Sequence, residues 1–100
     1  MVVIQFGKNA KENEKLSNSI GGKDYWFHAR DCPGSHVVLK GTPLETDIIH
    51  AARLAATHSK SKELNTAVIV ARGIDIFKPD GFPIGTICCK KSTFMIVTKL

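Results

Sequence analysis

A β-hairpin is predicted by the sequence Asp24-Tyr25-Trp26-Phe27-His28-Ala29-Arg30, Cys32-Pro33-Gly34-Ser35 and His36-Val37-Val38-Leu39-Lys40. The outer two segments are rich in aromatic and β-branched residues, which favour strands. In the middle segment, Pro33 presets φ at the first central position of a type II turn, and Gly34 supplies the positive φ of the second. We therefore predict two antiparallel strands, over 24–30 and 36–40, joined by a tight turn.

Alternate side chains of the first predicted strand share a face, because a strand has a period of two residues. One face carries Tyr25, Phe27 and Ala29, and the other carries Trp26, His28 and Arg30. Aromatic and basic groups that alternate on one face can stack on bases and contact phosphate. In the alternative, Trp26 belongs to the core and Arg30 is a solvated rim. The predicted tight turn would pair His28 with Leu39 and place His36 on the opposite face.

A helix that follows Asn9 is predicted next to the first strand. Asn9 is a good N-cap and Glu12 occupies the capping-box position, so the helix should run over 10–19. Gly7, Lys8 and Asn9 would then form the mouth of this helix. Free backbone N–H groups at a helix N-terminus, with a mobile lysine nearby, can hold a phosphate. The motif lacks the full spacing of a nucleotide-binding loop, so an ordinary strand-to-helix connection is the alternative.

The second predicted helix begins in Thr42-Pro43-Leu44-Glu45, a Thr-x-x-Glu capping box with proline in the first turn. It should continue to about Lys60 and lay an alanine-rich stripe on the sheet. Another face of this helix carries His50, Arg53, Thr57 and Lys60. Such a basic edge can follow a phosphate backbone, or it is simply solvated.

The remaining predicted strands are short. They cover 2–6, 67–71, 74–78, 86–90 and 93–98. Together with the hairpin and the two helices they define an α+β fold. We expect a single domain over residues 1–100, with a mostly antiparallel sheet of about six strands, because a chain of this length can bury one hydrophobic core.

The charge of the chain favours a polyanionic partner. Fourteen Lys and Arg against nine Asp and Glu give a net charge of +5. No apolar run approaches the ~20 residues that a membrane span needs, and the first residues do not have the pattern of a signal peptide. The three cysteines form no even framework, so we expect reduced thiols and a cytoplasmic protein.

The sequence does not indicate a site for metal or covalent chemistry. His28, Cys32 and His36 are residue types that bind zinc, but they straddle a turn and have no fourth ligand nearby. Ser35 and His36 are neighbours in sequence, which is no evidence for a nucleophile–base pair, because such pairs are assembled in space. We therefore expect no metal, no cofactor, no catalytic residue and no enzymatic activity.

Five segments, taken in order, resemble one family. They are Gly7-Lys8-Asn9-Ala10-Lys11-Glu12-Asn13, Asp24-Tyr25-Trp26-Phe27-His28-Ala29, Pro33-Gly34-Ser35-His36-Val37-Val38, Ala51-Ala52-Arg53-Leu54-Ala55-Ala56 with Ser59, and Lys78-Pro79-Asp80-Gly81 with Gly85. From Val3 to Val97 the chain resembles the NFACT-R domain, the RNA-binding-type module of NFACT proteins. Those proteins bind the large ribosomal subunit that carries an obstructed peptidyl-tRNA, and they help to recruit tRNA for untemplated C-terminal tailing.

The resemblance implies a non-catalytic RNA-binding module that contacts tRNA or large-subunit ribosomal RNA in the ribosome-associated quality control of stalled translation, with the large ribosomal subunit as a further partner. The alternative is a protein-interaction adaptor that docks on a ribosomal or quality-control protein. The family's motif positions and the basic residues beside them give the expected RNA-binding residues: Gly7, Lys8, Asn9, Trp26, His28, Arg30, Pro33, Gly34, Ser35, His36, Arg53 and Lys60. The oligomeric state stays open, as does the question of whether the chain is a stand-alone module or an excised domain.

Overall fold

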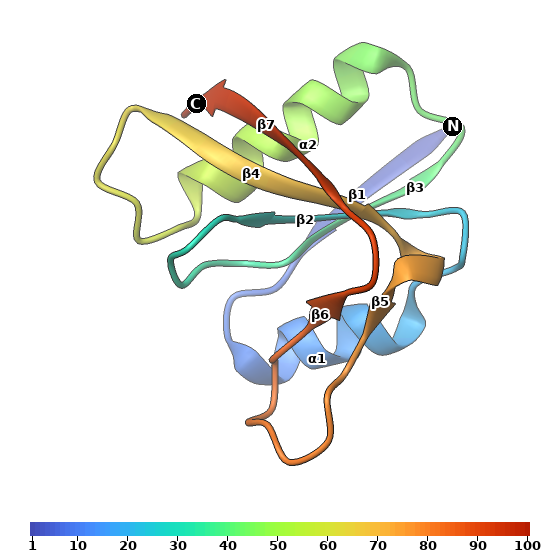
Figure 1. Ribbon diagram of the computed structural model, residues 1–100. Coiled ribbons are helices and arrows are strands. Elements are labelled where there is room, and N and C mark those ends of the chain that lie inside the picture. Colours follow the sequence, from blue (N-terminus) through green and yellow to red (C-terminus); the bar gives the residue numbers. More distant parts are fainter.

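The hairpin lies inside a five-stranded sheet. The computed structural model describes residues 1–100. Its elements are β1 (Val2–Phe6), α1 (Ala10–Ser19), β2 (Tyr25–Ala29), β3 (Val37–Gly41), α2 (Glu45–Thr57), β4 (Asn65–Arg72), the 3₁₀ turn η1 (Gly73–Asp75), β5 (Ile76–Phe77), β6 (Cys88–Cys89) and β7 (Thr93–Thr98). The sheet is antiparallel throughout, in the order β1-β3-β2-β4-β7, and β5 and β6 form a separate two-stranded ribbon (Figure 1). The predicted α+β fold is confirmed. Neither helix is long and apolar enough to cross a membrane.

Helix α2 covers one face of the sheet with small side chains. The buried residues of this helix are Ala51, Ala52, Ala55 and Ala56. They belong to the same cluster as Phe27, Leu39 and Val68 of the strands, all of which are fully buried. Because alanine is small, the helix can lie close to the sheet, and the predicted alanine-rich stripe is confirmed.

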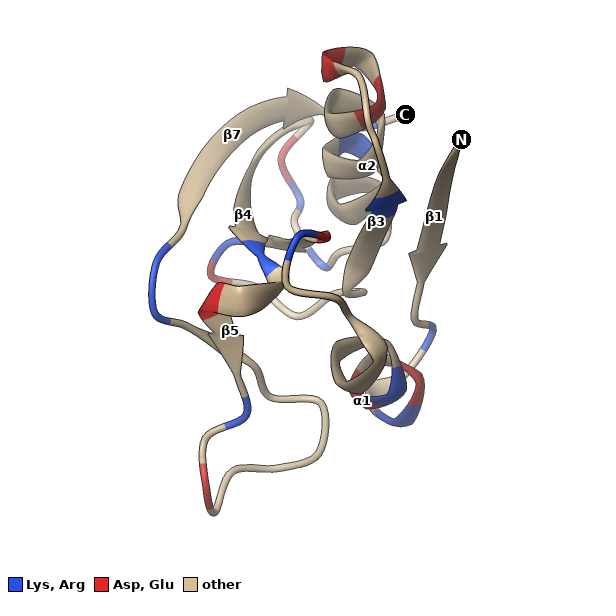
Figure 2. Cartoon of the chain, turned by 90° about the vertical axis from the view of Figure 1, so that its right-hand side faces the viewer, with Lys and Arg blue, Asp and Glu red and all other residues tan.

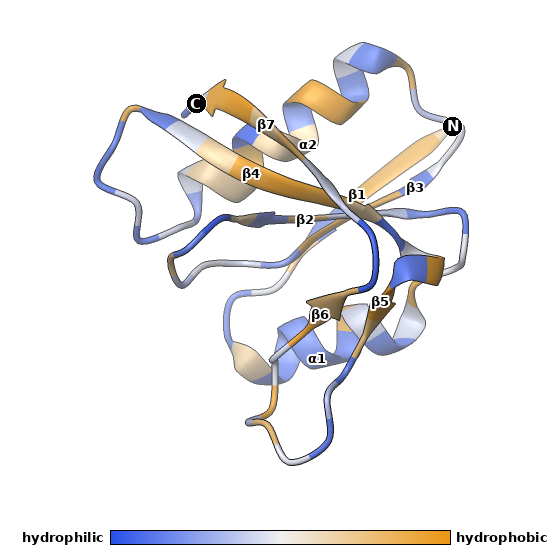
Figure 3. Ribbon diagram, in the orientation of Figure 1, coloured by the Kyte–Doolittle hydropathy of each residue, from blue (hydrophilic) through white to orange (hydrophobic).

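The opposite face of the sheet is covered by α1 and by the β5–β6 ribbon (Figure 1). Trp26 points to this side and is only 3% exposed. It forms a second buried cluster with Val38 and Ala71, against which Leu16 and Ile20 pack from the α1 region. Figure 3 shows α1 as a mostly hydrophilic helix, so few of its side chains take part in this contact. Trp26 is therefore a core residue, and its predicted place on an exposed RNA-binding surface is wrong.

The register of the hairpin differs from the predicted one. Residues 25–27 pair with 37–39, so that Trp26 lies opposite Val38. Continuing this register places His28 opposite His36, and the two side chains share one face of the sheet. The predicted position of His36 on the other face is wrong.

The connection between β2 and β3 is also not a tight type II turn. Its positive φ is adopted by Asp31 (59°), and Gly34 does not have a positive φ. Gly34 serves a different purpose, because a Cβ at this position would lie 3.0 Å from the Cα of Ser59. The missing side chain lets the connection approach the residues after α2, where Gly34 and Ser59 form an isolated antiparallel bridge.

Helix α2 begins later and ends earlier than predicted. Its N-cap is Leu44, whose backbone N–H donates to Oδ2 of Asp47 at 2.9 Å. The predicted capping box at Thr42 is therefore wrong. The helix stops at Thr57 rather than at Lys60, because the chain beyond it pairs with the β2–β3 connection.

The predicted strands on either side of the β5–β6 loop are shorter than expected. The strand predicted over 74–78 retains only Ile76–Phe77 as β5, because η1 covers its first two residues. The strand predicted over 86–90 retains only the two residues of β6. By contrast, the predictions over 2–6, 10–19 and 93–98 match β1, α1 and β7.

Candidate nucleic-acid interface

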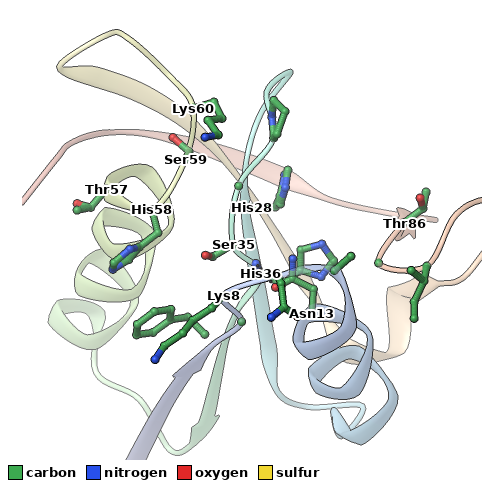
Figure 4. A pocket seen from close by; sticks show the side chains of 18 residues that line it. Lys8, Asn13, His28, Ser35, His36, Thr57, His58, Ser59, Lys60 and Thr86 are labelled. Carbon is green, nitrogen blue, oxygen red and sulfur yellow. Dashed lines mark hydrogen bonds between the residues drawn. The ribbon is translucent and has the colours of Figure 1, made fainter.

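A cleft of about 680 Å³ brings most of the predicted site residues together (Figure 4). Four segments line it: the turn from β1 into α1, the β2–β3 connection, the residues after α2 and the end of the β5–β6 loop. The lining residues are Phe6, Gly7, Lys8, Asn9, Ala10, Asn13, His28, Pro33, Gly34, Ser35, His36, Thr57, His58, Ser59, Lys60, Ile84, Gly85 and Thr86. No Asp or Glu is among them, although the carboxylates of Glu12 and Glu14 accept hydrogen bonds from the backbone N–H groups of the lining residues Lys8 and Gly85.

Backbone hydrogen bonds hold three of these segments against one another. The N–H of Gly7 donates to the carbonyl of His36 at 3.1 Å, which ties the β1–α1 turn to the β2–β3 connection. The N–H of Ser35 donates to the carbonyl of His58 at 3.1 Å, and that of Lys60 donates to the carbonyl of Pro33 at 2.8 Å. The walls of the cleft therefore share one hydrogen-bonded backbone frame.

Gly7 is required by the close approach of α1. A Cβ at Gly7 would lie 2.1 Å from Oδ1 of Asn13 and 2.8 Å from its backbone nitrogen. Asn13 is itself buried, and its Oδ1 accepts a hydrogen bond from the backbone N–H of His36 at 3.1 Å. Asn13 thus links the helix to the floor of the cleft.

His28 and His36 form the floor of the cleft, and the buried ring of Trp26 packs against both. His36 is 4% exposed, and its Nδ1 lies 3.3 Å from Oγ of Ser17. Its ring is nearly perpendicular to those of Trp26 and His28, with 5.2 Å between ring centroids in each pair. His28 in turn stacks on Trp26 at 5.8 Å. This arrangement follows from the hairpin register, because both histidines lie on the face of Trp26.

The two histidines of the floor are neutral near pH 7. Burial lowers the pKa of His36 to about 4, and the neighbouring His28 adds to this effect while Glu14 opposes it. Burial also lowers the pKa of His28, against the opposing effect of backbone groups of Ala29 and Gly34. A phosphate at neutral pH would therefore meet polar rings here and no positive charge.

The positive charge of the cleft lies at its rim. Lys8 and Lys60 are both exposed, and their ammonium groups make no ion pair or hydrogen bond within the chain. Figure 4 shows the two lysines apart from each other, with Ser35 and His58 in the space between them. The hydroxyl of Ser35 is likewise without a partner in the chain. These groups can bind an anion without first breaking an internal contact.

The N-terminus of α1 offers fewer free backbone N–H groups for a phosphate than predicted. Asn9 caps α1 as expected, with its Oδ1 accepting from the N–H of Glu12 at 2.9 Å. The N–H of Lys8, however, donates to Oε1 of Glu12 at 2.9 Å, and the N–H of Gly7 is bonded to His36. Two of the three amides expected to grip a phosphate are thus already bonded. The side chain of Lys8 is the remaining donor of positive charge at this point.

Arg30, Arg53 and Trp26 do not line the cleft. Arg30 lies 3.5 Å from Oδ2 of Asp31 and 4.7 Å above the ring of Phe94. Arg53 donates to the carbonyls of Thr98 and Lys99, at 2.8 and 3.3 Å. Figure 2 shows that Lys and Arg are spread over several connections of the chain, so the basic residues do not form one continuous stripe.

Sequence reasoning missed an aromatic pair at the cleft wall. Phe6 at the end of β1 and His58 after α2 stack with 4.5 Å between their centroids and 14° between their planes. Neither residue falls in a motif, and the contact joins distant parts of the chain. Asn13 was also missed, since an asparagine inside a polar helix gives no signal of burial.

Comparisons with known proteins identify the family. Residues 2–75 match the family described as "NFACT protein RNA binding domain". The chain is 34% identical to the "Rqc2 homolog RqcH" of Bacillus subtilis over 100 residues, which is 97% of this chain and 18% of that protein. It is 41% identical over 66 residues to the "Rqc2 homolog RqcH" of Streptococcus pneumoniae, covering 63% of this chain and 12% of that protein.

A solved structure is similar as well. The C-terminal part of the fibronectin/fibrinogen-binding protein from Streptococcus suis superposes with a TM-score of 0.93 and 31% identity, over 99% of this chain and 41% of that one. The chain spans less than a fifth of the length of the curated relatives named above. The family match, which covers most of the chain, and the similarity to these proteins agree with the architecture described here. The chain belongs to the family of NFACT protein RNA-binding domains.

Proposed function

We propose that the chain binds RNA through the cleft, with Lys8 and Lys60 contacting phosphates. The observation that carries this proposal is a pair of unpartnered ammonium groups at the rim of a cleft that no carboxylate lines. Phosphate contacts supply most of the affinity of proteins for nucleic acids, and they need free cations at a surface. Of the other lysines, Lys78 pairs with Glu14 and the ammonium group of Lys40 lies 3.9 Å from Asp24, whereas exposed lysines without a partner, such as Lys91, lie outside the cleft.

The binding is proposed to be non-catalytic. His28 and His36 are neutral near pH 7, and no carboxylate lines the cleft to orient either of them as a general base. The rigid frame of hydrogen bonds around the cleft suits recognition of a ligand.

The relatives suggest where this binding takes place. They are named as homologues of Rqc2, and the resemblance to NFACT proteins places such modules in the quality control of stalled ribosomes. We propose that this chain serves the same process by contacting tRNA or large-subunit ribosomal RNA, in the cytoplasm and with the large ribosomal subunit as partner.

Crosslinking in cells, followed by sequencing of the attached RNA, tests this proposal. The wild-type chain should recover tRNA or large-subunit ribosomal RNA, and the Lys8→Ala/Lys60→Ala variant should recover much less. Lys91→Ala is the matched control, because Lys91 is exposed and lies outside the cleft. Background RNA recovery by the wild type, together with an enriched protein partner, would reject RNA binding in favour of the adaptor alternative.

A further inference from the structure

Phe6 and His58 form an exposed aromatic pair that the fold does not need for its core. Phe6 is 37% exposed and His58 is exposed as well, and neither belongs to a buried cluster. Their rings are nearly parallel, with centroids 4.5 Å apart. An aromatic pair that stays in contact with water and lines a cleft is suited to receive another flat ring.

The pair is held in place by the backbone around it. Gly7, directly after Phe6, is hydrogen-bonded to the β2–β3 connection, and the carbonyl of His58 accepts from the N–H of Ser35. The backbone at both positions is therefore held against the same segment. Little conformational freedom remains to be lost when a ligand binds.

The surroundings of the pair match the parts of a nucleotide. Lys8 follows Phe6 by two residues and Lys60 follows His58 by two residues, so a free ammonium group accompanies each ring. The unpartnered hydroxyl of Ser35 lies in the same cleft, where it can hydrogen-bond to a base edge or a ribose. An aromatic platform with flanking cations is how proteins hold single-stranded nucleic acids.

We propose that the Phe6–His58 pair is a stacking platform for one unpaired nucleobase of RNA, with Lys8 and Lys60 on the neighbouring phosphates. This inference rests on the proposed RNA binding and adds the class of RNA. A base inside a duplex has both faces covered by its neighbours, whereas an unpaired base can leave one face to a protein ring. The site therefore selects a loop, bulge or end of the RNA over a continuous double helix.

Fluorescence anisotropy with two RNA probes tests the platform. The probes are an unstructured single strand of about ten nucleotides and a blunt duplex of the same length, both labelled at one end. We expect Phe6→Leu, which keeps an apolar side chain and removes the aromatic face, to weaken single-strand binding about tenfold. Duplex binding should stay unchanged. His58→Phe keeps an aromatic ring and should retain single-strand binding, whereas His58→Ala should weaken it like Phe6→Leu.

A second readout reports stacking directly. The fluorescence of 2-aminopurine, placed at one unpaired position of the single strand, is quenched when the base stacks. Quenching should appear with the wild type and with Lys91→Ala, and it should be lost with Phe6→Leu. A circular dichroism spectrum equal to that of the wild type shows that each variant is folded.

The outcomes separate this inference from the function on which it rests. If the wild type binds neither probe, the proposed RNA binding fails. If the wild type binds RNA but Phe6→Leu and His58→Ala bind both probes as tightly as it does, RNA binding stands and the stacking platform is rejected. Equal wild-type affinity for single strand and duplex would also overturn the platform.

Discussion

The ring of His28 meets the ring of His36 edge to face, with 5.2 Å between centroids and 86° between planes. His28 lies in β2, and His36 directly precedes β3 at the position opposite it. Both line the cleft, and the buried ring of Trp26 packs against them. Burial favours the neutral imidazole of both. Because the hairpin register brings both histidines to this buried position, it also makes the stability of the fold depend on pH.

Stability should fall as the pH drops from about 6.5 towards about 4. Burial lowers the pKa of His36 in the folded state to about 4, from an ordinary value of 6.5. Between these values the unfolded chain binds protons that the folded chain does not, so the free energy of unfolding decreases as the pH falls. A shift of this size corresponds to a loss on the order of 3 kcal/mol, and His28 contributes in the same direction.

Urea unfolding at several pH values between about 7 and about 5 measures this effect. The hydrogen bond from Lys78 lowers the pKa of Glu14 from its ordinary value of 4.5, so protonation of that carboxyl affects stability only at lower pH. His36→Gln should flatten the pH dependence, whereas His50→Gln, at an exposed position, should leave it unchanged. A wild-type stability that is flat over this range would contradict the buried, neutral histidines.

Gly7→Ala should destabilise the protein by about 1–3 kcal/mol. The new Cβ would lie 2.1 Å from Oδ1 of Asn13, so Asn13 must move and its hydrogen bond from His36 is strained or lost. Gly22→Ala is the matched control, because a Cβ there meets only the Cβ of Ile74 at an ordinary 3.6 Å. Denaturant unfolding of both variants checks the prediction, and equal stabilities would show that the β1–α1 turn tolerates a side chain.

Asp47→Ala should cost about 1 kcal/mol of stability, because its carboxylate accepts the hydrogen bond from the N-cap residue Leu44. Thr42→Ala should have little effect, since α2 does not begin there. Thermal unfolding of the two variants distinguishes the observed helix start from the one that the Thr-x-x-Glu pattern predicts. A larger loss of stability for Thr42→Ala than for Asp47→Ala would show that α2 begins at the predicted Thr-x-x-Glu capping box.

The sequence predicted those parts of the fold that depend on local patterns. The strand over 2–6, the Asn9 cap and the alanine stripe of α2 each follow from neighbouring residues, and all are confirmed. The hairpin register could not be predicted from local patterns, because it depends on a β2–β3 connection that is longer than a tight turn and has Asp31 at positive φ. The sequence pattern also could not show that the α1 region covers Trp26, because the position of this helix on the sheet is set by the tertiary fold.

The candidate site was partly predictable for the same reason. Gly7, Gly34 and His36 occur in motifs, and the structure brings them to one cleft. The structure also gives them packing roles that the motifs did not indicate: the glycines permit close approach of neighbouring segments, and His36 is buried. Their role in RNA binding stays a prediction. The contact between Phe6 and His58 is formed only by the tertiary fold, and no local pattern marks it.

The proposed function depends on the claim that Lys8 and Lys60 contact RNA phosphates, and the salt dependence of RNA affinity reports such contacts. Affinity of the wild type and of Lys8→Ala, Lys60→Ala and Lys91→Ala for one RNA would be measured between about 50 and about 200 mM salt. We predict that each cleft variant weakens binding and reduces the slope of log affinity against log salt by about one, while Lys91→Ala leaves the slope unchanged. An unchanged slope in both cleft variants would contradict the claim.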